Sequence, residues 1–575
     1  MRLAFKPLMF LMFMALSACE DTEAPITKIS VPAPEALSQH SEEFTPEVIK
    51  VTDNVYVAVG FGLANSILIE GETGVIIVDT MESNETARAV KAEFDKITSK
   101  PVKAIIYTHN HADHIFGSGV FAKGNTPKVY AHDLTNYYID RVVNVIRPAI
   151  YTRAMRQFGN YLPEGSRINN GIGPFLARVD GENAISLARP THTFSDHKSI
   201  EIEGIRMEFV HAPGETPDQL FVWLPDQKVL LPGDNFYKAF PNLYAIRGTS
   251  YRDVLQWSKS LDLMRDLRPE FLVPSHTRPL AGSDEIYEIL TDYRDAIQYV
   301  HDQTVRWINQ DLGPDEIVSK VKLPPHLSSS PYLQEFYGMV DWSVRSVFTG
   351  YLGWFSGNAT DLHPLSPAER ASRLSKLAAR NVTILDAAQE ALEAKDYQWA
   401  SELSDHLSHL QGMEETARQI KSQALLKLAE SQPSANGRNY YLTQALELNG
   451  SLTIPELKPE NNPLDIIHSL PIENIMAALP VNLKAEEALD RNMIVSFDFS
   501  DIGKNYYIHL RRGVAEVRAK SHPAPDIRVT VTSTVWKEIL ARVRNPAVAF
   551  ASDDIQVDGS LLDLVGFLQL FQPES

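Results

Sequence analysis

Three histidines and an aspartate lie within one six-residue stretch of this chain, at His109, His111, Asp113 and His114. The stretch directly follows an apolar run at 102–107 that has the composition of a β-strand. Imidazole nitrogens and carboxylate oxygens are ligands that zinc prefers, and a short loop at a strand end can direct alternate side chains toward two neighbouring ions. The residue types and their spacing therefore predict a metal site at the end of this strand.

The elements that must position this site are predicted by the apolar pattern around it. Short runs rich in β-branched residues predict strands at 55–59, 66–69, 74–79 and 102–107. A helix is predicted at 86–97, between the last two strands. Strand, helix and strand in this order indicate an α/β layered domain, which we assign to residues 46–300.

The remainder of the chain separates into two further predicted domains. Apolar residues spaced by three and four, with many Ala, Leu, Glu and Lys residues, predict an all-α domain at 301–458. Beyond it, apolar residues alternate with period two at 494–499, 506–510 and 527–532, with helical stretches on either side. This pattern predicts a small α+β domain at 459–575.

The N-terminus has the features of an export signal. Residues 1–18 combine two cations with an apolar run that is too short to span a bilayer permanently. Their end resembles the lipobox of bacterial lipoproteins, in which Cys19 becomes the lipidated first residue, and Glu20 favours the outer membrane over the inner one. We expect an exported protein that is lipid-anchored on the periplasmic side, with residues 19–45 as a flexible tether. The alternative is a soluble periplasmic protein in which the cysteine is incidental.

The composition limits the class of protein and its partners. The chain has 575 residues, of which 44% are hydrophobic, so it can form several cores and we expect a multidomain globular protein. It contains 54 Lys and Arg residues against 73 Asp and Glu residues, which gives a net charge of −19. This acidic balance argues against a nucleic acid or an anionic lipid bound through a broad basic face.

The H-x-H-x-D-H spacing of 109–114 resembles the signature of the metallo-β-lactamase fold. The resemblance implies an αββα sandwich for residues 46–300, with further ligands in later strand-end loops. By this resemblance two zinc ions are expected, with the ligands His109, His111 and Glu215 for one ion, Asp113, His114 and His276 for the other, and Asp234 as the bridge between them. Other histidines are expected to lie outside the ligand set, although His211 is near enough to Glu215 in the sequence to support it.

Within that superfamily, the chain resembles the alkylsulfatases. Glu215 stands where many relatives have a histidine, and the segment 242–248 is similar to the alkylsulfatase pattern after the bridging carboxylate. The resemblance implies that Asn242 and Arg247 bind the sulfate group; a planar guanidinium and a neutral amide suit a singly charged sulfate ester. The alternative role of Arg247 is a structural ion pair. Arg252 is a further candidate to assist catalysis.

The resemblance extends over almost all of the chain after the signal. Residues 351–358 and 362–365 are similar to the helical dimerisation domain of alkylsulfatases, which implies a homodimer. Residues 459–575 resemble their sterol-carrier-protein-like domain, whose apolar cleft would suit an alkyl tail. Two features depart from the family pattern: Asp234 replaces the usual Glu, and the loop at 213–217 is one residue shorter.

These features lead to one principal hypothesis and two alternatives. We expect a zinc-dependent hydrolase that cleaves alkyl sulfate esters such as dodecyl sulfate to an alcohol and inorganic sulfate, with a zinc-activated water as the nucleophile. The first alternative keeps the two-zinc site but acts on a lactone, a thioester, a β-lactam or a phosphate ester. The second alternative is a lipid-anchored lipid carrier whose metal domain only supports the fold.

Overall fold

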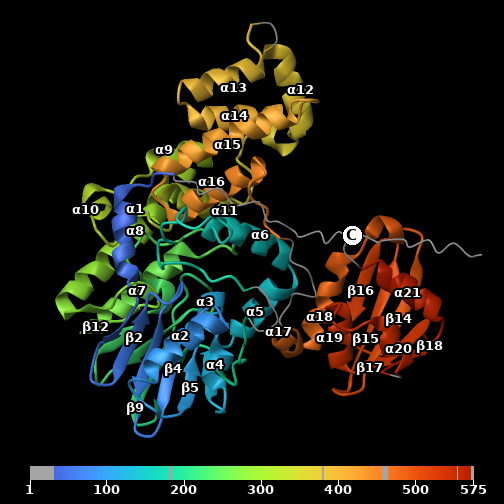
Figure 1. Cartoon of the computed structure of the whole chain (residues 1–575), viewed down its shortest axis with the longest axis horizontal. Helices are drawn as coiled ribbons and strands as arrows, with labels where there is room; N and C mark the ends of the chain where they lie inside the picture. Colours follow the sequence, from blue (N-terminus) through green and yellow to red (C-terminus); the bar gives the residue numbers. More distant parts are fainter. Residues whose placement is uncertain (1–30, 180–183, 379–380, 456–463, 553, 572–575) are drawn as a thin grey trace, which may run out of the picture.

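The computed structural model of the chain has three parts in sequence order: a domain with two sheets, a helical region, and a small domain with a sheet of its own (Figure 1). The residues that it describes are 31–179, 184–378, 381–455, 464–552 and 554–571. The predicted signal at 1–18 and the predicted lipidation site Cys19 lie outside these ranges. Across the described residues, no helix has the length and apolar character that a membrane span requires.

Seven strands form the first sheet of the N-terminal domain, in the order β1 to β7. Strands β1 to β4 pair antiparallel, and β4 to β7 pair parallel. Strand β4 is buried along its whole length, which explains why its sequence is a continuous apolar run rather than an alternating one. The strands are β1 (Glu47–Lys50), β2 (Val55–Val59), β3 (Ser66–Glu70), β4 (Val75–Val78), β5 (Val102–Ile106), β6 (Lys128–His132) and β7 (His192–Phe194).

Six strands form the second sheet, in the order β13-β12-β11-β10-β9-β8. The two sheets pack face to face, because one buried core combines Val57 and Ile76 of the first sheet with Phe209 and Val222 of the second. The strands are β8 (His197–Ile202), β9 (Ile205–His211), β10 (Leu220–Leu224), β11 (Val229–Leu231), β12 (Phe271–Leu272) and β13 (Leu280–Ala281).

Helices cover the outer face of each sheet, which completes the predicted αββα sandwich. Val90 of α2 packs with Ile77 outside the first sheet, and Trp257 of α7 packs with Phe221 outside the second. The helices of this domain are α2 (Asn84–Phe94), α3 (Ala112–Ile115), α4 (Ser118–Ala122), α5 (Thr135–Asn144), α6 (Arg147–Phe158), the 3-10 turn η2 (Gly233–Asn235), α7 (Val254–Asp266) and α8 (Ser283–Ile308).

Helix α8 runs through the predicted domain boundary at 300/301. One buried core contains Val300 from within α8, Ile317 of α9 and Val344 of α11, together with residues of the second sheet. The boundary at 300/301 therefore falls within α8, and the unit that packs on the second sheet continues through α11. The apolar face of one long helix continues across residue 300, so the change in composition did not coincide with a change in packing.

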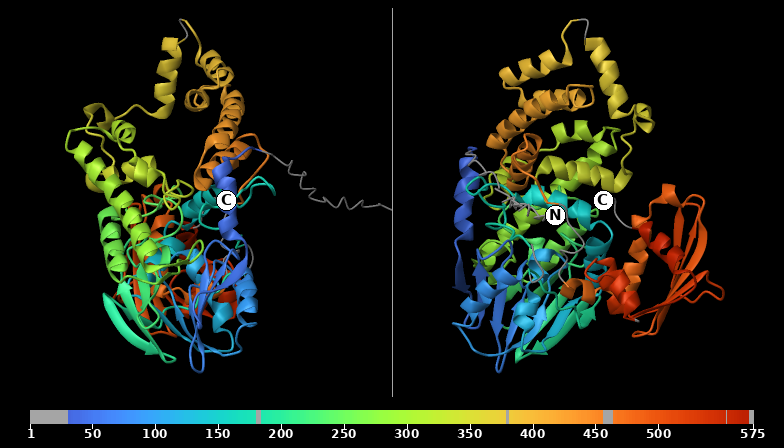
Figure 2. Two further views of the ribbon diagram at one scale, coloured as in Figure 1. Left: turned by 90° about the vertical axis from the view of Figure 1, so that its left-hand side faces the viewer. Right: turned by 45° about the vertical axis from the view of Figure 1, so that its right-hand side comes forward.

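The helical region continues beyond α11 as a projecting group of antiparallel helices (Figure 2). Helices α13 to α15 share a small core, which includes Ile384, Leu407 and Ile420. The chain then returns through α16, which packs against α6 of the N-terminal domain. The helices are α9 (Pro314–Lys320), α10 (Pro325–Ser328), α11 (Val340–Leu352), η3 (Ala359–Leu362), α12 (Pro367–Ala378), α13 (Ile384–Glu393), α14 (Tyr397–Leu407), α15 (Glu414–Ser431) and α16 (Ala435–Leu448).

The C-terminal domain has a five-stranded sheet in the order β16-β15-β14-β17-β18. Phe497, Val529 and Trp536 contribute to its own core, and its helix α18 packs against α5. Its elements are α17 (Leu464–Ser469), α18 (Ile472–Ala478), η5 (Leu479–Asn482), η6 (Ala485–Ala488), β14 (Asn492–Phe499), β15 (Lys504–Arg511), β16 (Val514–Arg518), β17 (Ile527–Val531), α19 (Ser533–Leu540), α20 (Pro546–Ala551), β18 (Ile555–Asp558) and α21 (Leu561–Gln569).

The prediction of a flexible tether over 19–45 is wrong for its second half. Two short helices, α1 (Glu35–Gln39) and η1 (His40–Phe44), occupy this segment, and their side chains Leu37 and Phe44 are buried. Nε2 of His40 also contacts the backbone oxygen of Gly171 at 2.8 Å. A few apolar side chains within a polar stretch are sufficient to dock it, which an average over composition does not reveal.

Candidate metal centre and anion site

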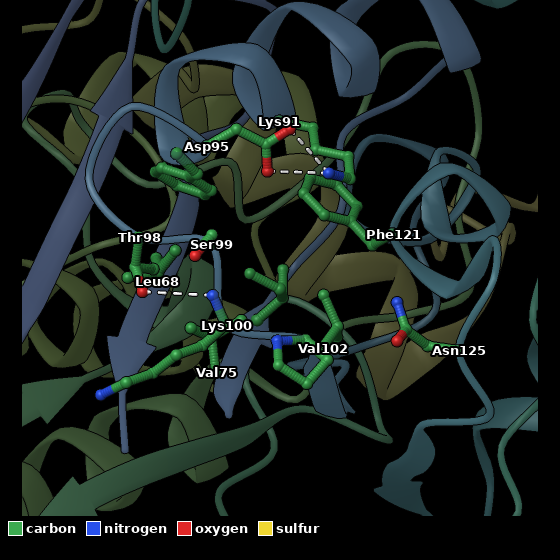
Figure 3. A pocket seen from close by; sticks show the side chains of 13 residues that line it. Leu68, Val75, Lys91, Asp95, Thr98, Ser99, Lys100, Val102, Phe121 and Asn125 are labelled. Atoms are coloured by element: carbon green, nitrogen blue, oxygen red, sulfur yellow. Dashed lines mark hydrogen bonds and ion pairs between the residues drawn. The ribbon is translucent and has the colours of Figure 1, made fainter. Parts of the chain in front are cut away.

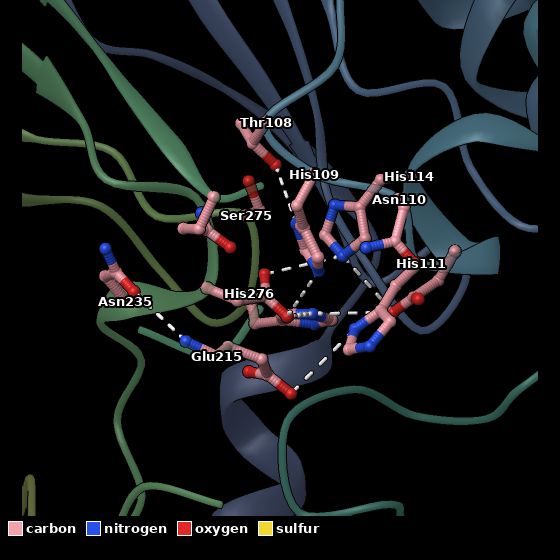
Figure 4. A network of polar contacts seen from close by, with 12 residues as sticks. Thr108, His109, Asn110, His111, His114, Glu215, Asn235, Ser275 and His276 are labelled. Carbon is pink, nitrogen blue, oxygen red and sulfur yellow. Dashed lines mark hydrogen bonds and ion pairs between the residues drawn. The ribbon is translucent and has the colours of Figure 1, made fainter. Parts of the chain in front are cut away.

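The signature histidines and aspartate lie in the loop after β5 and in the short helix α3 (Figure 4). His109 and His114 are fully buried, and Asp113 is 8% exposed. Atoms of metal-ligand type gather within 4.8 Å of one another in two groups, formed by His109, His111 and Asp234, and by Asp113, His114 and His276. Six of the seven predicted ligands therefore meet in the folded chain.

The carboxylate of Asp234 lies between the two groups. Its Oδ2 is 3.1 Å from Nε2 of His276 and 3.8 Å from Nε2 of His109. Its Oδ1 is 3.4 Å from Nε2 of His114. The shorter Asp side chain thus reaches both groups, which is the placement that a bridging ligand requires.

Several buried ligand atoms in this region have no hydrogen-bond partner: Nε2 of His109, Nε2 of His114, Oδ1 of Asp234 and Oε2 of Glu215. Leaving a buried polar atom unpaired costs about 1–3 kcal/mol. Four such atoms in one cluster indicate that a bound group, such as a metal ion, accepts their lone pairs. Histidine nitrogens with carboxylate oxygens are a donor set that fits divalent metal ions.

Glu215, the seventh predicted ligand, lies at the edge of the first group. Its Oε1 is 3.9 Å from Nδ1 of His111 and forms a buried ion pair of 2.8 Å with Nη1 of Arg252. The same nitrogen of Arg252 donates to the backbone oxygen of Asn242 at 2.5 Å. Arg252, which the sequence offered as a catalytic candidate, is therefore placed to orient Glu215, and a guanidinium that stays protonated does not transfer protons.

The pKa values of the ligand side chains follow from their burial and their mutual proximity. Burial lowers the pKa of His109 and of His111 well below the ordinary range. Burial opposes protonation of His114 too, but Asp234 and Asp113 raise its pKa well above the ordinary range. Burial would raise the pKa of Asp234, yet the histidines around it hold that pKa well below its ordinary range. Neutral imidazoles and charged carboxylates are the forms that bind metal ions, so His109, His111 and Asp234 already have the required charge, whereas His114 must release a proton when a metal ion binds.

The carboxylate of Asp79 orients this cluster through hydrogen bonds to His114 and its neighbours. This role was not predicted from the sequence. The fully buried carboxylate of Asp79 accepts hydrogen bonds from Nδ1 of His114 at 2.8 Å and from Oγ of Ser275 at 2.7 Å. It also accepts from the backbone nitrogen and the hydroxyl of Thr108, each at 2.9 Å. The available signal was its position directly after β4, beside the end of the neighbouring strand β5, which leads to His109.

Each of the two predicted anion-binding residues is connected to a predicted ligand: Arg247 contacts His111, and the backbone oxygen of Asn242 accepts from Arg252, which pairs with Glu215. Nη2 of Arg247 is 3.3 Å from Nε2 of His111. Asn242 is 1% exposed, and both polar atoms of its side-chain amide have no partner. A buried amide without a partner is suited to hydrogen-bond a ligand, and a guanidinium is suited to bind an anion.

Comparison with known proteins identifies the family. Sequence models match for the metallo-beta-lactamase superfamily over residues 59–276, for alkyl sulfatase dimerisation over 313–451, and for the alkyl sulfatase C-terminal domain over 460–575. A linear primary-alkylsulfatase of Pseudomonas sp. is 37% identical to the chain over 526 residues, which cover 88% of the chain and 98% of that protein. The chain belongs to the alkylsulfatase family.

Further relatives extend this result to the whole fold. An (R)-specific secondary-alkylsulfatase of Pseudomonas sp. is 27% identical, over 92% of this chain and 81% of that protein. The solved structure of a stereoselective inverting sec-alkylsulfatase of Pseudomonas sp. superposes with a TM-score of 0.86 at 26% identity, over 95% of this chain and 88% of that one. The predicted family and fold class are therefore confirmed, and this protein is an enzyme of the alkylsulfatase family.

Three buried tyrosines add to the site of this alkylsulfatase and were not predicted. The hydroxyl of Tyr237 accepts the backbone N–H of Asn242 at 2.8 Å, and its ring contacts those of Tyr293 and Tyr337 edge-on. Burial, followed by the charge of Glu215, raises the pKa of all three hydroxyls above the ordinary range, so they stay protonated. Tyr337 comes from the helical region, and no local motif marks any of the three.

His211 of this alkylsulfatase lies outside both ligand groups, as predicted, and its contacts are with residues other than Glu215. The ring of His211 stacks on His132, with a centroid separation of 3.9 Å and an interplanar angle of 14°. Its Nε2 contacts the backbone oxygen of Pro217 at 2.8 Å. His211 ends β9 beside another strand end, where it faces His132 rather than Glu215.

A pocket of about 270 Å³ lies between α2 and the beginning of β4 and β5 (Figure 3). Phe94, Val102 and Phe121 form part of its lining, and Lys91 lies at its polar edge. Strand β5 leads away from this pocket to His109 at its other end. The pocket is therefore separate from the metal centre of the alkylsulfatase.

We predict that Glu82 makes the stability of this alkylsulfatase depend on pH. Glu82 is 1% exposed, and burial raises the pKa of its carboxyl from 4.5 to about 7. The folded state therefore keeps a proton that the unfolded state has already lost, and stability falls as pH rises from 4.5 through about 7. Glu82→Gln removes this loss.

The measurement is the free energy of unfolding of both metal-free proteins by urea titration, at pH 8 and below pH 4.5. When the pH is lowered, the free energy of unfolding of the wild type should increase by about 3 kcal/mol relative to that of Glu82→Gln. If the difference in free energy of unfolding between the two proteins is the same at both pH values, the prediction is contradicted.

Proposed function

We propose that this protein hydrolyses alkyl sulfate esters such as dodecyl sulfate to an alcohol and inorganic sulfate, with two zinc ions as cofactors. The observation that supports this most directly is the placement of Arg247 beside the ligand His111, together with the buried side-chain amide of Asn242, which has no partner. Relatives that match along most of the chain are named as primary and secondary alkylsulfatases.

The proposed ligand sets follow the two groups in the fold. One ion would be held by His109, His111 and Glu215, the other by Asp113, His114 and His276, with Asp234 shared by both. Bound zinc would supply Lewis acidity, which lowers the pKa of water to about 7 and makes a nucleophile available at neutral pH. The chain's own contribution is orientation: Asp79 fixes His114, and Arg252 fixes Glu215.

Arg247 and Asn242 would bind the sulfate group of the substrate. A guanidinium offers paired N–H donors to the oxygens of a tetrahedral anion, and an amide adds a neutral donor. A sulfate monoester carries one negative charge, so one guanidinium is an adequate partner. In a site sheltered from water, these donors stabilise the charge that develops on the sulfate as the ester bond breaks.

The other two domains would serve assembly and the apolar part of the substrate. The dimerisation match over 313–451 supports a homodimer. The match of residues 460–575 to the alkyl sulfatase C-terminal domain supports a role of this domain in holding the alkyl tail. In this proposal the substrate is a small amphiphile, with a charged sulfate group and an apolar alkyl tail.

A substrate panel with the zinc-loaded protein tests the proposal. Sulfate release from short, long, primary and secondary alkyl sulfates is compared with hydrolysis of a lactone, a thioester, a β-lactam and a phosphate ester. We expect kcat/KM for at least one alkyl sulfate to exceed that for every other class by about 100-fold or more. Turnover of a lactone or phosphate ester without any release of sulfate would overturn the proposed substrate class.

We further propose that the protein is exported and lipid-anchored through Cys19 at the periplasmic side of the outer membrane. The charged start, the short apolar run and the lipobox-like residues before Cys19 support this. Expression with a radiolabelled fatty acid should label the wild type and not the Cys19→Ser variant. Equal labelling of the two proteins, or none of either, would contradict the proposal.

A further inference from the structure

The segment that contains Arg247 belongs to no helix or strand. Residues 241–253 run as an irregular loop between η2 and α7. Gly248, the next residue, has a φ of +106°, which an L side chain rarely adopts. The direction of the Arg247 side chain therefore depends on contacts that other parts of the fold make with this loop.

Helix α6 supplies such contacts on both sides of the Arg247 backbone. The N–H of Arg247 donates to Oε1 of Gln157 at 2.8 Å. The carbonyl of Arg247 accepts from Nε of Arg153 at 2.7 Å, and the carbonyl of Ile246 accepts from Nη2 of the same guanidinium at 2.6 Å. Gln157 follows Arg153 by four residues, so both side chains lie on one face of the helix. The two residues together hold both peptide groups that flank the Arg247 side chain.

The burial of Gln157 makes its contact difficult to replace. Its side chain is fully buried, so water cannot take over as acceptor for the N–H of Arg247. A buried N–H without a partner is costly, and the loop would move to restore a bond. Arg153 is exposed, but its contacts to two neighbouring carbonyls use the fixed fork of the guanidinium, which a lysine cannot reproduce.

Helix α6 is itself held in place by the helical region. Arg156, on the next turn of α6, forms a paired ion contact with Glu447 of α16, with N···O distances of 2.8 and 3.1 Å. The side chain of Glu447 is 21% exposed in this pair. The position of the loop with Arg247 is thus connected to α16 through a single rigid helix.

We propose that α6 is the positioning element of the anion site, in which Gln157 and Arg153 fix the backbone of Arg247 so that its guanidinium faces the substrate. The proposal rests on the proposed function, because it takes Arg247 to be the residue that binds sulfate. Gln157 and Arg153 do not touch the reacting atoms; they act through Arg247. Their loss should weaken binding of the anion far more than it changes zinc content.

The experiment compares Gln157→Met, which keeps the volume and loses the acceptor, with Gln157→Glu, which keeps an oxygen at the same reach. Arg153→Met tests the other side of the loop, and Arg206→Met, an exposed ion-pair residue on β9, is the control. Two quantities are measured on each zinc-loaded protein: the KM and kcat for dodecyl sulfate, and the Kd for inorganic sulfate by calorimetry. Zinc content and melting temperature are recorded alongside.

We expect Gln157→Met, which loses one well-formed hydrogen bond, to raise both the KM and the sulfate Kd by about tenfold. Arg153→Met, which loses two, should raise both quantities at least as much. Gln157→Glu should stay closer to the wild type than Gln157→Met, and Arg206→Met should be unchanged. Variants with a lower melting temperature but an unchanged KM and sulfate Kd would overturn the inference and leave Gln157 a purely structural residue.

The experiment distinguishes failure of the proposed function from failure of the inference about α6. If the wild type releases no sulfate from dodecyl sulfate, that function fails, while the sulfate Kd still tests the positioning by α6. If the wild type is active and the Gln157→Met variant binds sulfate as tightly as the wild type, only the inference about α6 fails.

Discussion

Replacing Arg247 with alanine is expected to lower kcat/KM for an alkyl sulfate by about 10²–10³-fold. The guanidinium lies 3.3 Å from Nε2 of His111, so it can contact an anion beside the metal ligands. Arg247 contacts Nε2 of His111, whereas Nδ1 of the same ring faces Glu215. Removing the Arg247 side chain should therefore leave the ligand set intact. Zinc content should therefore equal that of the wild type. The measurement is steady-state sulfate release with zinc determined on the same samples.

Arg206→Ala is the matched control, because Arg206 forms an exposed ion pair with Asp226 and lies at the start of β9, at the end of that strand away from His211. It should keep wild-type kcat/KM. If Arg247→Ala retains full activity, or if it loses zinc together with activity, the role of Arg247 as an anion-binding residue is refuted.

Replacing Asp79 with asparagine is expected to weaken zinc binding by about 10–100-fold. The carboxylate accepts hydrogen bonds from His114, Thr108 and Ser275, and it is fully buried. An asparagine amide would present N–H donors to groups that are themselves donors. His114 would lose both its fixed orientation and the negative charge that makes it a stronger ligand.

Zinc affinity is measured by competition with a chromophoric chelator. Asp95→Asn provides the control, since Asp95 is an exposed partner of Lys91 on the surface of α2. An unchanged zinc affinity in Asp79→Asn would show that this carboxylate does not orient the ligands.

The parts of this account that were predictable from sequence are those encoded by neighbouring residues. The cluster from His109 to His114 is contained in six consecutive residues, so its metal-binding chemistry could be predicted from the local sequence. Glu215, Asp234 and His276 required the order of later strand-end loops and a family resemblance. Strands β2 to β5 were predictable because a buried strand requires an uninterrupted apolar run, and β14, β15 and β17 were predictable from their alternating pattern. The strands of the second sheet were not predicted.

The parts that were missed depend on contacts between distant segments. Asp79 reaches His114 from the preceding strand, and Gln157 reaches Arg247 across 90 positions. Tyr337 comes to the same site from the helical region. Each of these residues has an ordinary local sequence, so its role exists only after the chain has folded.

The errors have related physical causes. The tether was wrong for residues 35–44 because burial of Leu37 and Phe44 outweighs a polar composition. The boundary at 300/301 falls inside a helix because the buried face of α8, which packs mainly on α7 and α11, continues to residue 300 and beyond. In both cases packing against distant residues overrode the local signal.

The measurement that tests the central claim most directly is sulfate release from dodecyl sulfate by residues 20–575, after chelation and again after zinc is restored. We predict background turnover in the chelated protein and full recovery at about two zinc ions per chain. Full turnover in the chelated protein would contradict the metal-dependent mechanism. Binding of two zinc ions without release of sulfate from any alkyl sulfate would contradict the proposed reaction while leaving the fold and the metal centre in place.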